Sequence, residues 1–172
     1  MQEVTIRLRI TQPCLGFVKR QLASSKNVIY RMPRDCQGRV IFLGSWWRDR
    51  MQYAARVVGK CYDGVSGIAW ATNIDGRVAE WRRHLSPTGD GKRQRYALHE
   101  AFRPGSEIGV TAVLPPPITI PDFIELLTVV GTYKGISPFQ AEEETYGTFE
   151  VLSVLPTIRQ PRDEPVRRKV VT

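Results

Sequence analysis

Two amphipathic helical segments, each flanked by segments of extended type, constrain the fold of this chain more than any other feature. The first is expected over residues 46–58, because apolar residues recur there at helical spacing while polar residues line the opposite side. Ser45 is expected to cap its start, and Gly59 to end it with a positive φ. The stripe predicted to face the core contains Trp47, Met51, Ala54, Ala55 and Val58.

The second helix is expected to begin around Pro121 and to end at Gly131. Pro121 fits a first turn because its missing N–H costs nothing there, and Asp122 complements the positive end of the helix dipole. Its predicted buried stripe contains Phe123, Leu126, Leu127 and Val130.

The remaining apolar segments read as β-strands. Apolar and polar residues alternate over residues 4–11, which predicts a strand with one buried face. Further strands are expected over 107–114, where three prolines stop the segment, and over 148–155. Two hairpins are predicted, one joining 27–31 to 39–43 and one joining 66–73 to 77–81 through Asp75-Gly76. The order strand, inserted hairpin, helix, strands, helix, strand defines an α+β fold.

Composition places the chain among single-domain, cytoplasmic proteins. Its 172 residues fit one core, which we expect over residues 1–155, followed by a basic flexible tail at 156–172. No apolar run approaches the roughly 20 residues of a membrane helix, and the N-terminus lacks the pattern of a secretion signal. The three cysteines are widely spaced, as suits a reducing compartment. We expect no metal site and no cofactor.

A net charge of +8 favours polyanionic partners, and residues 81–96 concentrate it. This stretch has five basic residues, one acid and aromatic residues at both ends. Arginine and lysine neutralise phosphates and aromatic faces stack on bases, so the stretch is a candidate channel for RNA or single-stranded DNA. A solvated, flexible loop is the open alternative. The candidate contacts are Trp81, Arg82, Arg83, Lys92, Arg93, Arg95 and Tyr96.

A second candidate is the glycine-bearing segment 131–147, which contains Lys134 and Gly135. Glycine allows close backbone approach to a ligand, and free N–H groups in such loops cradle phosphates. The alternative is that its glycines are only a helix cap, a turn and a tight entry into a strand.

The end of the chain resembles the RAMP superfamily, the ferredoxin-like RNA-binding proteins of CRISPR complexes. The resemblance rests on Gly131-x-Tyr133-x-Gly135-Ile136 followed by Tyr146-Gly147-Thr148-Phe149-Glu150-Val151, and the element order agrees over about residues 3–155. Small uncharacterised bacteriophage proteins share this ending. The resemblance implies a ferredoxin-like (RRM-like) antiparallel sheet with two helices and inserted hairpins, and a loop that lies against RNA. Three glutamates at 142–144 depart from it, because they would repel phosphate.

These observations favour nucleic-acid binding over catalysis. The expected protein coats RNA or single-stranded DNA through its phosphates, as a homo-oligomer or as a backbone subunit of a CRISPR-type or phage-encoded ribonucleoprotein. The alternative is a structural subunit that contacts only proteins. The phosphate-loop, nucleophile-elbow and zinc-protease motifs are missing from the sequence. An RNA-processing endonuclease that uses His84 as general acid or base is the enzymatic alternative.

Overall fold

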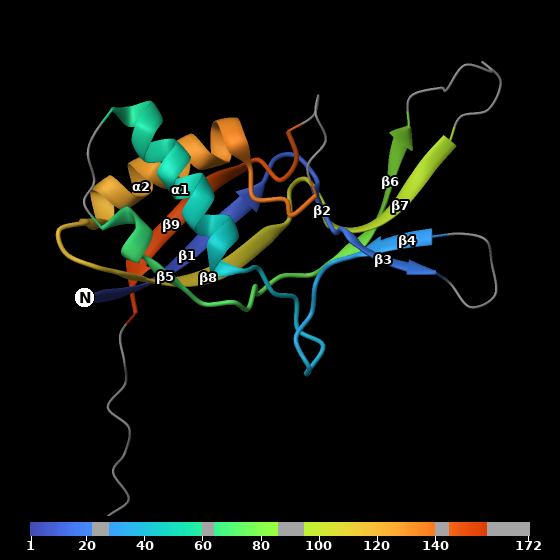
Figure 1. Ribbon diagram of the computed structural model, residues 1–172, viewed down its shortest axis with the longest axis horizontal. Helices are drawn as coiled ribbons and strands as arrows, with labels where there is room; N and C mark the ends of the chain where they lie inside the picture. Colours follow the sequence, from blue (N-terminus) through green and yellow to red (C-terminus); the bar gives the residue numbers. More distant parts are fainter. Residues whose placement is uncertain (22–27, 60–63, 86–94, 140–144, 158–172) are drawn as a thin grey trace, which may run out of the picture.

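The computed structural model is a mixed α+β structure with one antiparallel sheet and a second sheet in which every pair but the parallel pair β4–β7 is antiparallel (Figure 1). The first sheet contains β1 (Gln2–Ile10), β5 (Ala69–Trp70), β8 (Glu107–Leu114) and β9 (Phe149–Pro156), in the order β5-β8-β1-β9 with every neighbouring pair antiparallel. The expected strands at 4–11, 107–114 and 148–155 are therefore present. The structure describes residues 1–21, 28–59, 64–85, 95–139 and 145–157.

Helices α1 (Gly44–Val58) and α2 (Ile120–Val129) pack on one face of this sheet (Figure 1). The alternating residues of β1 supply the floor of the core, with Val4, Ile6 and Leu8 fully buried. The predicted helix stripes are confirmed, because the side chains of both point into this core. Trp47 stacks on Trp70 of β5 with ring centroids 4.3 Å apart, which fixes α1 over the sheet.

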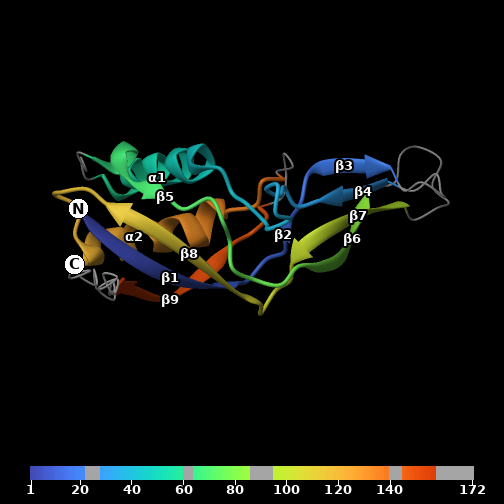
Figure 2. The same ribbon diagram turned by 90° about the horizontal axis from the view of Figure 1, so that it is seen from below.

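The second sheet extends away from the helices as an arm (Figure 2). It contains β2 (Cys14–Leu15), β3 (Val18–Gln21), β4 (Val28–Arg31), β6 (Ala79–Leu85) and β7 (Arg95–Phe102). Strand β7 lies in the centre: β6 pairs along one side of it, and β2 and β4 pair along the other. Among the described strands β6 is therefore an edge of this arm.

Both predicted hairpins are wrong. Strand β4 pairs with β3, and residues 39–43 make only the isolated bridges Arg34↔Val40 and Ile41↔Asn73. Strand β5 pairs with β8, whereas β6 pairs with β7, which was not expected. The Asp75-Gly76 dipeptide lies beside β8, where Asp75 exchanges backbone hydrogen bonds with Gly109. Local turn chemistry was a poor guide because the actual partners lie far apart in the sequence.

Two helix ends also differ from expectation. Leu43 occupies the N-cap position of α1 without a side-chain hydrogen bond, so Ser45 already lies inside the helix. Helix α2 begins with a capping box in which Thr119 and Asp122 bond each other's backbone N–H. Its end is not at Gly131, because the chain continues through a π-helical turn, η2 (Val130–Lys134), and leaves it at Gly135. Gly59 does end α1, with a φ of 69°.

Beyond 155 the last strand continues for one residue, and the Thr157 N–H donates to the Glu3 carbonyl at 2.9 Å. Residues 158–172, which make up most of the expected tail, lie outside the described residues. In the described part of the chain, no helix has the length and apolar character needed to cross a membrane.

Candidate nucleic-acid interface

A groove of about 750 Å³ runs between β6 and the glycine-bearing segment. Its described walls combine three predicted contact residues of β6, and the candidate general acid or base His84, with residues that flank β1, β7 and β9, so the two stretches singled out in the sequence meet here. No described residue of the lining is a carboxylate. The lining residues are Gln12, Pro13, Trp81, Arg82, Arg83, His84, Pro104, Thr132, Thr145, Tyr146 and Thr148.

Strand alternation divides the β6 side chains between two faces. Trp81 and Arg83 are half-buried on the face toward the glycine-bearing segment, whereas Arg82 and His84 are exposed. Tyr96 lies opposite His84 in the β6–β7 register, half of its surface is exposed, and the Arg82 guanidinium lies 5.2 Å from its ring centroid. Arg82 and Tyr96 thus form a cation–π pair at the outer rim of the arm.

Arg83 is held on two sides by uncharged groups. Its guanidinium lies 4.8 Å from the centroid of the Phe139 ring, and its Nε–H donates to Nε2 of His99 at 3.4 Å. None of the described carboxylates makes an ion pair with it. Its positive charge is therefore available to a ligand in the groove.

The opposite wall is built from close backbone contacts of the glycine-bearing segment. A Cβ on Gly135 would lie 2.2 Å from the Tyr146 carbonyl oxygen, and a Cβ on Gly131 would lie 2.3 Å from that of Phe149. The Gly135 N–H donates to the Val130 carbonyl at 2.8 Å. Gly135 therefore shapes the wall through its small size and its φ of 65°, and its N–H is used within the protein.

Arg50 of α1 connects this wall to the helical layer, and no prediction from the sequence singled it out. Its guanidinium donates to the carbonyls of Gly135 at 2.6 Å, Ser137 at 2.8 Å and Trp46 at 2.9 Å. Burial lowers the pKa of its guanidinium, and the negative charge of Asp49 partly opposes this. One arginine among several in an amphipathic helix has no local signal that marks it as a buried donor.

The other predicted residues are placed elsewhere or not described. The Lys134 ammonium lies 5.3 Å from the centroid of the Tyr53 ring of α1, and Lys134 does not line the groove. Lys92 and Arg93 lie outside the described residues, as do the glutamates at 142–144. The backbone of Arg95 begins β7 opposite Leu85, and its side chain is not described.

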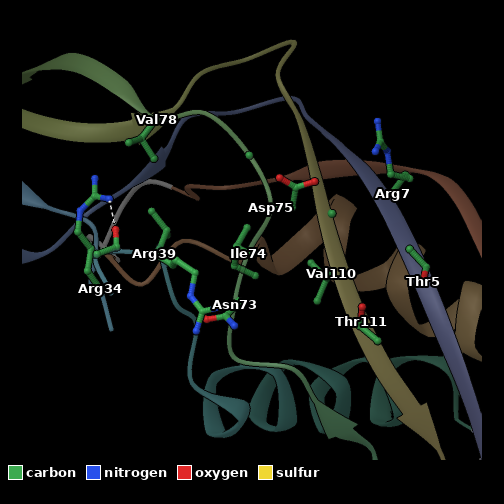
Figure 3. Close-up of a pocket in the computed structure, with 14 residues that line it drawn as sticks. Thr5, Arg7, Arg34, Arg39, Asn73, Ile74, Asp75, Val78, Val110 and Thr111 are labelled. Atoms are coloured by element: carbon green, nitrogen blue, oxygen red, sulfur yellow. Dashed lines mark hydrogen bonds between the residues drawn. The ribbon is translucent and has the colours of Figure 1, made fainter. Parts of the chain in front are cut away.

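A second hollow, of about 540 Å³, lies on the face of the first sheet that carries no helix (Figure 3). Its three arginines are engaged within the protein: Arg34 with Glu100 at 3.2 Å and the Gly38 carbonyl at 2.8 Å, Arg39 with Asp35 at 2.7 Å, and Arg7 with Glu107 at 3.3 Å. Hydrogen bonds from Arg39 and Gln37 hold the pKa of Asp35 below its usual value. Its cations are thus already neutralised by neighbouring carboxylates.

No group of three or more described histidine, cysteine or acidic side chains is arranged to hold a metal ion. Cys14 is fully buried, and burial raises the pKa of its thiol far above the usual range, so the thiol stays protonated.

The sequence matches no family model and no curated protein. The fold matches a chain in the cryo-EM structure of the type III-B Cmr-beta bound to cognate target RNA, with a TM-score of 0.58 and 10% sequence identity. The match covers 90% of this chain and 60% of that one, so this chain spans well under two thirds of its neighbour. The likeness is one of fold.

Proposed function

We propose that this protein binds RNA or single-stranded DNA through the phosphate backbone, in the groove between β6 and the glycine-bearing segment. The observation that carries the proposal is Arg83, a groove-lining cation that no described carboxylate neutralises. Arg82 and His84 line the same groove, and Tyr96 of β7, which forms the cation–π pair with Arg82, is half exposed. Cationic grooves with aromatic faces suit single strands because both contacts tolerate any base sequence.

The fold supports the same proposal. We propose that β1, α1, β5, β8, α2 and β9 make up a ferredoxin-like unit; their order along the chain and the sheet order β9-β1-β8-β5 support this. The arm is then an insertion on this plan, made by the segments around β2–β4 and β6–β7. A chain of similar fold occurs in a complex bound to target RNA, and we propose a corresponding role here as a cytoplasmic ribonucleoprotein subunit of CRISPR or phage type.

The test is a salt titration of binding. Nuclease-treated protein is mixed with a fluorescent single-stranded RNA or DNA of about 20 nucleotides, long enough for one site of about 4–16 nucleotides. If about five phosphates are neutralised, the log–log plot of affinity against salt should have a slope of roughly −3 to −4. A slope near zero, or binding to neither polymer, would reject the proposal.

A structural subunit without nucleic acid is the second candidate, and the edge strand β9 favours it. Leu152 and Leu155 are 38% and 61% exposed on β9, which among the described strands pairs only with β1. Edge strands with exposed apolar residues are sites where another chain adds on. Light scattering of the nuclease-treated protein separates the candidates, because this role requires oligomers in the absence of nucleic acid.

The endonuclease alternative has a direct test in His84→Ala. Cleavage of a labelled RNA by the wild type that disappears in the variant would establish it, and an intact substrate with both proteins would exclude it.

A further inference from the structure

His99 lies at the centre of the arm, fully buried between three elements. Its ring stacks on Tyr30 of β4 with centroids 4.8 Å apart, and the ring of Phe139 meets it edge-on at 4.9 Å. Arg83 of β6 approaches Nε2, and Nδ1 lies 2.8 Å from the Gly16 carbonyl oxygen. None of the predictions from sequence used this histidine.

These contacts fix the protonation state of the ring. A carbonyl oxygen only accepts hydrogen bonds, so Nδ1 must carry the hydrogen. In the neutral ring Nε2 then has a lone pair, which matches the Nε–H that Arg83 directs at it. A doubly protonated ring would set an N–H and a positive charge against the guanidinium at a separation of 3.4 Å.

The charged and titratable groups around the ring favour its neutral form. Arg83 is the cation that faces it, and Tyr30 is the titratable side chain stacked on it. The neighbouring Glu100 is directed away, to the Met32 N–H and to Arg34. Burial lowers the pKa of His99, the Gly16 carbonyl partly opposes this, and Arg83 lowers the pKa further.

We infer that His99 is a positioning residue for the groove: its neutral ring accepts a hydrogen bond from Arg83 and holds that guanidinium over Phe139, so protonation of His99 displaces Arg83 and weakens nucleic-acid binding. This inference rests on the proposed function. The expected pH dependence is unusual. A basic protein ordinarily binds a polyanion more tightly as it gains protons, whereas protonation of His99 removes the phosphate contact of Arg83 from this groove.

The binding test compares affinity for the same single-stranded RNA at about pH 7.5 and at a pH below the midpoint of the His99 titration, which lies below the ordinary histidine pKa. The wild type should bind about fivefold more weakly at the lower pH, with a salt slope shallower by about 0.7, the contribution of one phosphate contact on a single strand. The variant His99→Gln keeps a neutral hydrogen-bond acceptor and donor at this position, so its affinity for the RNA should not fall at the lower pH.

His84→Gln is the matched control, because the chain contains only two histidines. This variant should retain the loss of affinity at low pH, since His99 is intact. Tighter binding of the wild type at the lower pH, or the same loss in His99→Gln, would overturn the inference.

A measurement on the free protein separates this inference from the proposed function. By NMR, the Arg83 Nε–H resonance should be protected from exchange at about pH 7.5 and should lose protection with the midpoint of the His99 titration. If the two signals titrate together and no RNA binds at either pH, the proposed function fails and the His99–Arg83 contact stands. If protection of Arg83 does not follow His99, the inference fails whatever the RNA result.

Discussion

The two hollows of this molecule both contain arginines, but they differ in the partners that hold those arginines. The hollow on the open face of the first sheet has three arginines, each in an ion pair with a carboxylate. The groove along β6 has two arginines: Arg82 lies 3.9 Å from the Glu80 carboxylate, whereas Arg83 is held by an aromatic ring and a histidine. The comparison teaches that the partners of a basic residue, more than the number of basic residues, mark a candidate anion site.

The largest expected effect is a loss of stability when Gly135 is replaced, and Gly38 provides the comparison. Gly135→Ala in the groove wall combines a positive φ with a Cβ 2.2 Å from a carbonyl oxygen, so it should destabilise the fold by about 3 kcal/mol or more. Gly38→Ala in the other hollow has a positive φ but no atom within 4 Å, and should cost only about 1 kcal/mol. Urea denaturation measures both, and equal losses would contradict a tightly packed groove wall.

Arg50 tests how firmly the groove wall is tied to the helical layer. Arg50→Met leaves three carbonyls without their shared donor, so the free energy of unfolding should fall by about 2–4 kcal/mol. Arg48→Met, at an exposed position of the same helix, is the control and should change it by about 0.5 kcal/mol or less. Denaturation curves that coincide for the two variants would show that the Arg50 contacts are not important for stability.

Replacing two arginines by glutamine in each region tests the comparison through the affinity for a single strand. Arg82→Gln with Arg83→Gln should weaken single-strand binding about 10- to 100-fold and make the salt slope shallower by about 1.4. Arg7→Gln with Arg9→Gln removes the same charge from the ion-paired open face and should change affinity by about threefold or less. Fluorescence anisotropy at several salt concentrations gives both numbers, and the reverse ranking would move the interface to the open face.

The smallest expected effect is a difference in acid sensitivity between the regions. The folded protein lowers the pKa of His99 below 6.5, so the unfolded chain takes up a proton first and stability falls as the pH drops below about 6.5. Asp35, the partner of Arg39 beside the other hollow, also has a lowered pKa, and its contribution is lost only as the pH falls below 3.8. Thermal melts across this range should show the first step in the wild type and not in His99→Gln.

The sequence by itself determined the elements whose burial follows a regular period. The strands β1, β8 and β9 and both helix stripes were predictable because alternation and helical spacing report which face meets the core. Trp81, Arg82, Arg83 and His84 were singled out as candidates because basic and aromatic residues cluster there in the chain, and whether they bind a ligand stays a prediction.

Only the tertiary structure decided the partners of those elements. Strand β6 pairs with β7, β4 pairs with both β3 and β7, and Arg50 and His99 gain their roles from carbonyls and side chains distant in sequence. Turn propensity is a local energy, whereas strand pairing and the burial of a polar side chain depend on surfaces that exist only after the chain has folded.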